Sequence, residues 1–156
     1  MEELKVMFTK LFRQYSGSNR LDMNEIFLII ATVIASRSTC NVISSGAVIV
    51  DKHNQIISMG YCGAPSGFEH CCDRGDCWLL DHKDVGKCLG IHAPVNAIIN
   101  AKGRDLEGST IYIAGYDRIK KCMISADLCP GCLGAIKNAG IENIITTDYE
   151  KPSQPV

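Results

Sequence analysis

The sequence contains no apolar run long enough to cross a membrane. Its longest such stretch, residues 26–35, is well short of the roughly 18 residues that a membrane-spanning helix needs, so it predicts a buried helix. The first residues also lack the basic and then apolar pattern of a secretory signal. We therefore expect a cytoplasmic protein with no membrane partner, in a compartment that keeps thiols reduced.

The sequence also lacks an excess of charge of either sign. Its 16 lysines and arginines nearly balance 17 aspartates and glutamates, so the net charge is -1. Such a chain has no field that would attract nucleic acid, and any contact with DNA or RNA would have to be local. An apolar fraction of 46% and a charged fraction of 21% argue against disorder and coiled coil. At 156 residues the chain suits one compact domain.

Hydrophobic periodicity predicts helices that interleave with strands. Apolar residues from Leu4 to Tyr15 recur at helical spacing, which indicates an amphipathic helix within an N-terminal segment, residues 1–20. Asp22 and Glu25 resemble a capping box at the start of a second helix. Further helices are expected over residues 94–102 and 131–139, and strands over 46–50, 55–60, 109–114 and 143–147.

The interleaved elements predict an α/β fold with a layered sheet over residues 21–150. The first two expected strands are joined by a polar turn, as in a hairpin. Residues 61–89 are rich in glycine, cysteine and charge, with little periodicity, and should form a long ordered loop that needs an internal staple. Residues 151–156 are expected to be a flexible tail.

Cysteine is the residue type that stands out, with nine in the chain. An odd number in a reducing compartment favours metal ligands and buried thiols over disulfides. Cys129 and Cys132 lie three residues apart at the start of an expected helix, where exposed backbone N–H groups favour thiolates. Zinc is the favoured interpretation, with His92 as the best third ligand. A redox motif and two ordinary buried thiols stay open as alternatives.

Residues 41–144 resemble the deoxycytidylate deaminases of the cytidine and deoxycytidylate deaminase family. The resemblance is carried by Gly-Ala-Val-Ile-Val at 46–50, Gly-Tyr-Cys-Gly-Ala-Pro-Ser-Gly at 60–67, Lys-Cys-Leu-Gly-Ile-His-Ala-Pro-Val-Asn-Ala-Ile at 87–98 and Cys-Pro-Gly-Cys at 129–132. It extends to Ser-Arg-Ser-Thr-Cys at 36–40 and Asn-Ala-Gly-Ile at 138–141. It implies a cytidine-deaminase-like α/β/α layered fold with a central mixed sheet of about five strands.

The resemblance also implies a zinc ion held by His92, Cys129 and Cys132, since the base deaminases share a His-x-Glu and Pro-Cys-x-x-Cys signature. Three protein ligands leave a fourth position for water, whose pKa the metal lowers. In the family a glutamate two residues after the histidine moves the protons, and this chain has Pro94 there. Losing one positioned acid/base group costs on the order of 10²–10⁴ in rate. The backbone tolerates the change, because proline is well accommodated in a first helical turn.

Other family positions also differ. Cys62 replaces an asparagine that contacts the substrate, and residues 41–45 replace basic residues suited to a phosphate. Leu128 replaces a proline before the first zinc cysteine. The resemblance places the ligand pocket at Cys62, Gly63, Ala64, Pro65 and Ala93.

Three further assignments stay open. Glu69 or Asp73 could supply a substitute carboxylate, with Glu69 as the named candidate. The Cys62 thiol could instead fill the fourth zinc position. A second zinc, which some relatives carry in the matching insertion, would be bound by His70, Cys71, Cys77 and Cys88, unless these are free thiols or packing residues. Cys40 and Cys122 are interpreted as structural thiols.

The sequence therefore supports three hypotheses of function. The first is a pseudo-deaminase that binds a nucleotide or related small molecule without turnover, and so sequesters or senses it. The second is an active deoxycytidylate deaminase that uses a substitute acid. The third is a structural subunit, because the resemblance implies a homo-oligomer, often a hexamer.

Overall fold

The structure, a computed structural model, describes residues 1–15, 17 and 19–147 of the chain. The predicted tail, 151–156, lies outside these residues. The helices are α1 (Glu2–Gln14), α2 (Met23–Ala35), α3 (Cys71–Arg74), the 3-10 helix η1 (Val85–Lys87), α4 (Ala93–Asn100) and α5 (Pro130–Asn138). The strands are β1 (Ile43–Val50), β2 (Ile56–Tyr61), β3 (Thr110–Asp117), β4 (Cys122–Ile124) and β5 (Asn143–Thr146).

The five strands form one mixed sheet, as predicted. Their order is β2-β1-β3-β4, and β5 also pairs with β3. The β3–β5 pair is parallel and the other pairs are antiparallel, so β1 and β2 make the predicted hairpin. Residues 46–50 of β1 are all buried, because helices cover both faces of the sheet at this strand.

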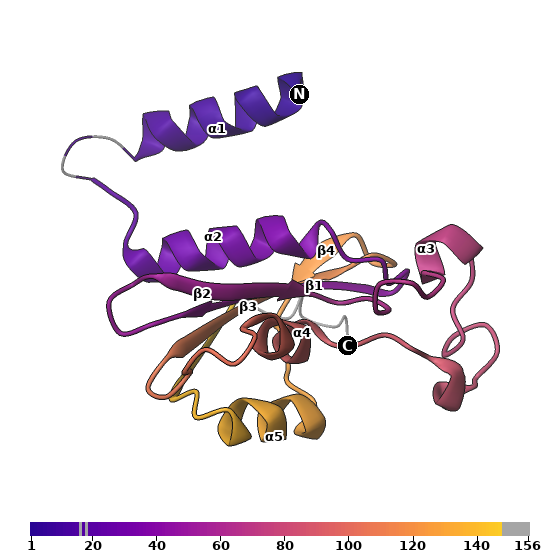
Figure 1. Ribbon diagram of the computed structural model, residues 1–156. Coiled ribbons are helices and arrows are strands. Elements are labelled where there is room, and N and C mark those ends of the chain that lie inside the picture. The colour runs from indigo at the N-terminus through magenta and orange to yellow at the C-terminus, as the bar shows by residue number, and fades with distance from the viewer. Residues whose placement is uncertain (16, 18, 148–156) are drawn as a thin grey trace, which may run out of the picture.

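Two apolar cores hold the layers together, one on each face of the sheet (Figure 1). On one face Phe27 and Ala31 of α2 pack against Val48 and Tyr112. On the other, α4 and α5 are buried against the strands through residues that include Ala97, Ile136, Ile49 and Ile111. The arrangement is the α/β/α sandwich that the sequence predicts.

Two glycines on neighbouring strands set how closely the helices approach. A Cβ atom on Gly46 would collide with the Ala31 carbonyl oxygen of α2, and one on Gly60 would collide with the Ala97 backbone nitrogen of α4. Only glycine leaves room for helix backbone at these positions. Gly60 therefore fixes the depth at which α4, and the residue that precedes it, lie on the sheet.

The remaining elements lie at the margins. Figure 1 shows α1 above α2, and none of its residues belongs to either core. Phe8 and Phe12 of α1 are exposed. The capping box at Asp22 and Glu25 is present, with both of its hydrogen bonds. Residues 62–89 carry only α3 and η1, because β2 extends to Tyr61. The sequence did not predict β4, because three residues give too little periodicity. In the described part of the chain, no helix combines the length and apolarity that crossing a membrane requires.

Candidate metal centre

The centre forms where the first turns of α4 and α5 meet. His92 is the N-cap residue of α4, and Cys129 is the N-cap residue of α5, both with extended backbone. Pro94 and Pro130 lie in the first turns of these helices, where proline suits the fixed backbone angle and no N–H is missed. The His92 ring caps no backbone N–H of α4 and is left to face the two thiols.

The three side chains have the spacing of a zinc site. Nδ1 of His92 lies 3.2 Å from Sγ of Cys132 and 3.4 Å from Sγ of Cys129. Tetrahedral zinc with ordinary bond lengths places such nitrogen and sulfur atoms about 3.6 Å apart. All three ligand atoms lie within 4.8 Å of one another, and no other such group of histidine, cysteine or carboxylate side chains occurs in residues 1–15, 17 and 19–147. The donor set therefore fits a single zinc ion, through Nδ1 of the histidine.

The two thiols have different electrostatic surroundings. The backbone N–H of Cys132, which donates to Sγ of Cys129 over 3.4 Å, lowers the pKa of the Cys129 thiol. Burial raises the pKa of Cys132 to about 12, and the neighbouring Cys129 adds to this rise. A bound zinc ion deprotonates coordinating thiols outright, so both can serve as thiolate ligands.

A cavity of about 380 Å³ opens beside the three ligands. This volume is in the range of small-molecule sites. Pro94 is buried and lines the same cavity as His92, Cys129 and Cys132. Its ring has no donor, acceptor or titratable group, so it presents only carbon to whatever occupies the space.

Most of the predicted pocket residues also line the cavity. Cys62, Gly63, Ala64 and Ala93 are part of its wall, and Pro65 is not. Paired backbone bonds between Gly63 and Ile91, of 3.1 and 2.9 Å, join the loop after β2 to the segment before α4. This pairing holds the Gly63 loop beside His92.

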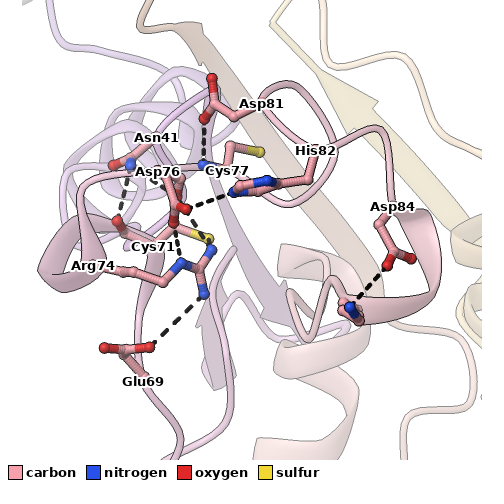
Figure 2. Close-up of polar contacts among 10 residues, drawn as sticks. Asn41, Glu69, Cys71, Arg74, Asp76, Cys77, Asp81, His82 and Asp84 are labelled. Carbon is pink, nitrogen blue, oxygen red and sulfur yellow. Dashed lines mark hydrogen bonds and ion pairs between the residues drawn. The ribbon is translucent and has the colours of Figure 1, made fainter.

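Glu69, the predicted substitute carboxylate, lies away from the cavity wall. Figure 2 shows its carboxylate directed toward Arg74. The carboxylate lies 3.9 Å from the Arg74 guanidinium, and the Glu69 side chain is 65% exposed. Asp127 is the one carboxylate among the cavity-lining residues that the structure describes. Sequence reasoning missed Asp127, although its position two residues before Cys129 could have indicated it.

The cysteines of the predicted second zinc site are only partly gathered. Cys71, Cys77 and Cys88 line the cavity, whereas Nδ1 of His70 lies 3.2 Å from the Thr39 hydroxyl. The described part of the chain does not bring these four donors into a group as close as the first. Nor does Cys62 join the close group of His92, Cys129 and Cys132.

Cys40 is a further cavity residue whose surroundings the sequence did not reveal. It lines the cavity beside Cys62, whose thiol hydrogen-bonds to it. That bond, together with the Ile43 and Val42 backbone N–H groups, lowers the pKa of Cys40 from 9.0 to about 5. The same contact and burial raise the pKa of Cys62. Seven of the nine cysteines line this one cavity: Cys40, Cys62, Cys71, Cys77, Cys88, Cys129 and Cys132.

Known proteins resemble this chain across most of its length. It is 33% identical over 142 residues to the deoxycytidylate deaminase of Mycobacterium phage D29, which covers 86% of this chain and 99% of that protein. It is 36% identical over 135 residues to ComE operon protein 2 of Bacillus subtilis, with 84% of this chain and 62% of that protein covered.

Solved structures show the same fold. The crystal structure of the dCMP deaminase from cyanophage S-TIM5, in complex with dCMP and dUMP, superposes with a TM-score of 0.61 at 24% identity. The superposition covers 80% of this chain and 79% of that one. The family model of the cytidine and deoxycytidylate deaminase zinc-binding region matches residues 22–147, which contain all three ligands. On this similarity, and on the zinc-compatible group at the ends of α4 and α5, the chain belongs to the cytidine and deoxycytidylate deaminase family.

Proposed function

We propose that this protein is a catalytically impaired deaminase that binds a nucleotide or related small molecule beside its zinc ion. The proposal depends on one observation, that the sequence resemblance places Pro94 at the position of the family's acid/base glutamate. Pro94 is buried in the cavity wall beside the three zinc ligands. Binding without turnover would let the protein sequester or sense its ligand.

The side chains around the zinc would bind and orient but not move protons. When bound by His92, Cys129 and Cys132, zinc would act as a Lewis acid that makes water a better nucleophile. Deamination also needs a group that takes and returns protons at the ring, and proline offers none. The absence of that group costs on the order of 10²–10⁴ in rate.

The alternative is an active deoxycytidylate deaminase with a substitute acid/base. One observation favours it, namely that the Asp127 carboxylate lines the cavity two residues from Cys129. Glu69, the other candidate, would first have to leave Arg74 and turn into the cavity. On this alternative, Asp127→Asn or Glu69→Gln removes activity that the wild-type protein has.

The test is ammonia release by the zinc-loaded protein incubated with dCMP, dCTP and cytidine. We expect rates at least 10²-fold below those of an active deoxycytidylate deaminase assayed in parallel. Ligand binding is measured independently, by native mass spectrometry of the purified protein. Rapid zinc-dependent formation of dUMP from dCMP would overturn the proposal and favour the alternative.

We also propose a second zinc ion, bound by donors from His70, Cys71, Cys77 and Cys88. Support comes from Cys71, Cys77 and Cys88, which all line the cavity, where a metal would staple the irregular segment around α3. Binding requires the segment to close further around the ion. Zinc counting by native mass spectrometry tests this, with two ions expected in wild type and one in Cys71→Ser; one ion in both contradicts it.

A homo-oligomer, a hexamer by resemblance, is also part of the proposal. Phe8 and Phe12 of α1 are exposed aromatic residues, and their burial between subunits would stabilise the oligomer. Light scattering after size-exclusion chromatography tests it, and a monomer at micromolar concentration contradicts it. A cytoplasmic location is proposed because thiolate ligands need reducing conditions.

A further inference from the structure

We infer that the ligand of this cavity carries no phosphate, and is a neutral heterocycle such as a nucleobase or nucleoside. The inference rests on the proposed function, because it concerns the ligand of the same site. The proposed function allows a nucleotide or a related small molecule, and this inference limits the ligand to molecules without charge. The charges around the cavity support it.

The cavity wall offers no cation to a phosphate. No lysine or arginine is among the lining residues that the structure describes, and the lining histidine, His92, faces the two zinc thiols. The charged groups left are the Asp127 carboxylate and Cys40, whose lowered pKa makes it a thiolate, and both repel an anion. Val42, Ile43 and Ser45, from the segment at the start of β1, contribute only neutral side chains.

The zinc centre does not supply the missing charge. Two thiolates and a neutral imidazole cancel the charge of Zn²⁺, so the loaded centre is neutral. A phosphate dianion that enters this wall loses its hydration and meets the hydroxyls of Thr39, Ser45 and Ser125, but no cation. Burying an unpaired charge is strongly unfavourable, whereas a neutral ring loses little.

The segment that borders the cavity through Cys71 and Cys77 carries net negative charge. Residues 69–87 contain three lysines and arginines against five aspartates and glutamates, a charge of -2 with histidine neutral. Two of the three basic groups of this segment have acidic partners, and Figure 2 shows those of Arg74. Arg74 pairs with Asp76 and Glu69, and Lys87 pairs with Asp84 at 3.3 Å.

Arg118, the residue after β3, is also engaged. Its Nε donates to the Ser44 hydroxyl over 2.6 Å, and its Nη2 donates to the Ser38 carbonyl over 3.0 Å. Ser38 and Ser44 are buried, so these bonds hold the guanidinium against the protein. Freeing it for a phosphate would leave buried polar groups unpaired.

The experiment is isothermal titration of the zinc-loaded protein with 2′-deoxycytidine and with dCMP, at low and at high salt. We expect deoxycytidine to bind about tenfold more tightly than dCMP at low salt, with a smaller difference at high salt because salt screens the repulsion. Equal affinities, or tighter binding of dCMP, overturn the inference and leave the proposed function standing. Binding of neither compound overturns both.

Two variants separate charge from shape. Val42→Lys places a cation in the wall, and Val42→Gln places a neutral side chain of similar length there. We expect Val42→Lys to shift the affinity ratio about tenfold toward dCMP, and Val42→Gln to leave it unchanged. Asp127→Asn, at an exposed position, should raise the affinity for dCMP and not for deoxycytidine. An unchanged ratio in both Val42→Lys and Asp127→Asn contradicts the inference.

Discussion

Pro94 occupies the second position of α4, where either proline or glutamate can begin a helix. Pro94→Glu therefore adds a carboxylate beside the zinc ligands with little change to the backbone. If the missing acid/base group limits turnover, deamination of dCMP or deoxycytidine should rise by about 10²-fold or more. The measurement is ammonia release at saturating substrate.

The matched control for that change is Pro94→Gln, because glutamine has nearly the same shape as glutamate but cannot exchange a proton. It should stay at the wild-type rate. If wild type already releases ammonia as fast as Pro94→Glu, then Pro94 is not what limits the chemistry.

A second prediction at the residue scale concerns the pH dependence of Cys40. Its pKa is lowered to about 5 by the Cys62 thiol and backbone N–H groups, so the thiolate is already formed at pH 7. Because the thiolate is the reactive form, alkylation of Cys40 by iodoacetamide should fall only as the pH drops through about 5. Mass spectrometry of peptides from the zinc-loaded protein measures the rate at this site.

Removing the donor should shift that profile. In Cys62→Ala the pKa of Cys40 rises, so the loss of reactivity moves to higher pH. Cys122→Ala, which leaves the cavity wall intact, serves as the control and should not shift it. Identical profiles for wild type and Cys62→Ala would show that the Cys62 thiol does not stabilise the thiolate.

At the scale of elements, Gly60 and Gly46 allow a comparison between the two faces of the sheet. Alanine at either position meets helix backbone, and each change should destabilise the fold by about 1–3 kcal/mol. Only Gly60→Ala pushes on α4, whose N-cap is His92. We expect zinc affinity to fall about tenfold in Gly60→Ala, because a shift of α4 would move the ligand His92 and weaken the metal site. Zinc affinity should be unchanged in Gly46→Ala.

Competition with a chromophoric chelator measures both affinities, and urea denaturation measures both stabilities. Gly134→Ala is the control for helix α5, because no atom lies within 4 Å of the added carbon. It should stabilise the protein by about 0.5–1 kcal/mol. Equal losses of zinc affinity in Gly60→Ala and Gly46→Ala would mean that general destabilisation, not the position of α4, controls the site.

At the scale of the whole molecule, zinc joins the starts of two helices that lie on one face of the sheet. A ligand that binds only the folded state stabilises it, by about 2.7 kcal/mol at a free concentration one hundred times Kd. Removing zinc with a chelator should therefore lower the melting temperature. Differential scanning calorimetry with and without added zinc measures the change.

Cys129→Ala tests whether this effect comes from the described centre. The variant should melt below the zinc-loaded wild type and should gain less stability from added zinc than wild type does. If it still gains stability from zinc to the same extent as wild type, then the stabilising ion binds elsewhere.

The sequence by itself determined the α/β fold and the residues of the first metal site. Periodicity fixes which side of a helix or strand is apolar, and the spacing of Cys129 and Cys132 places both at one helix start. The mixed five-stranded sheet and the close group of His92, Cys129 and Cys132 confirm those predictions. The family followed from the same motifs.

The tertiary structure alone decided what surrounds the metal ligands. Residues 61–89 have little periodicity, so no local rule indicated that Glu69 faces Arg74, or that Cys40 contacts Cys62. The absence of lysine and arginine from the described cavity wall also depends on how loops from β1, β2 and α5 converge. This arrangement of loops brings together residues that are far apart in the chain. It depends on interaction energies between pairs of side chains from different segments, which no single segment of sequence contains.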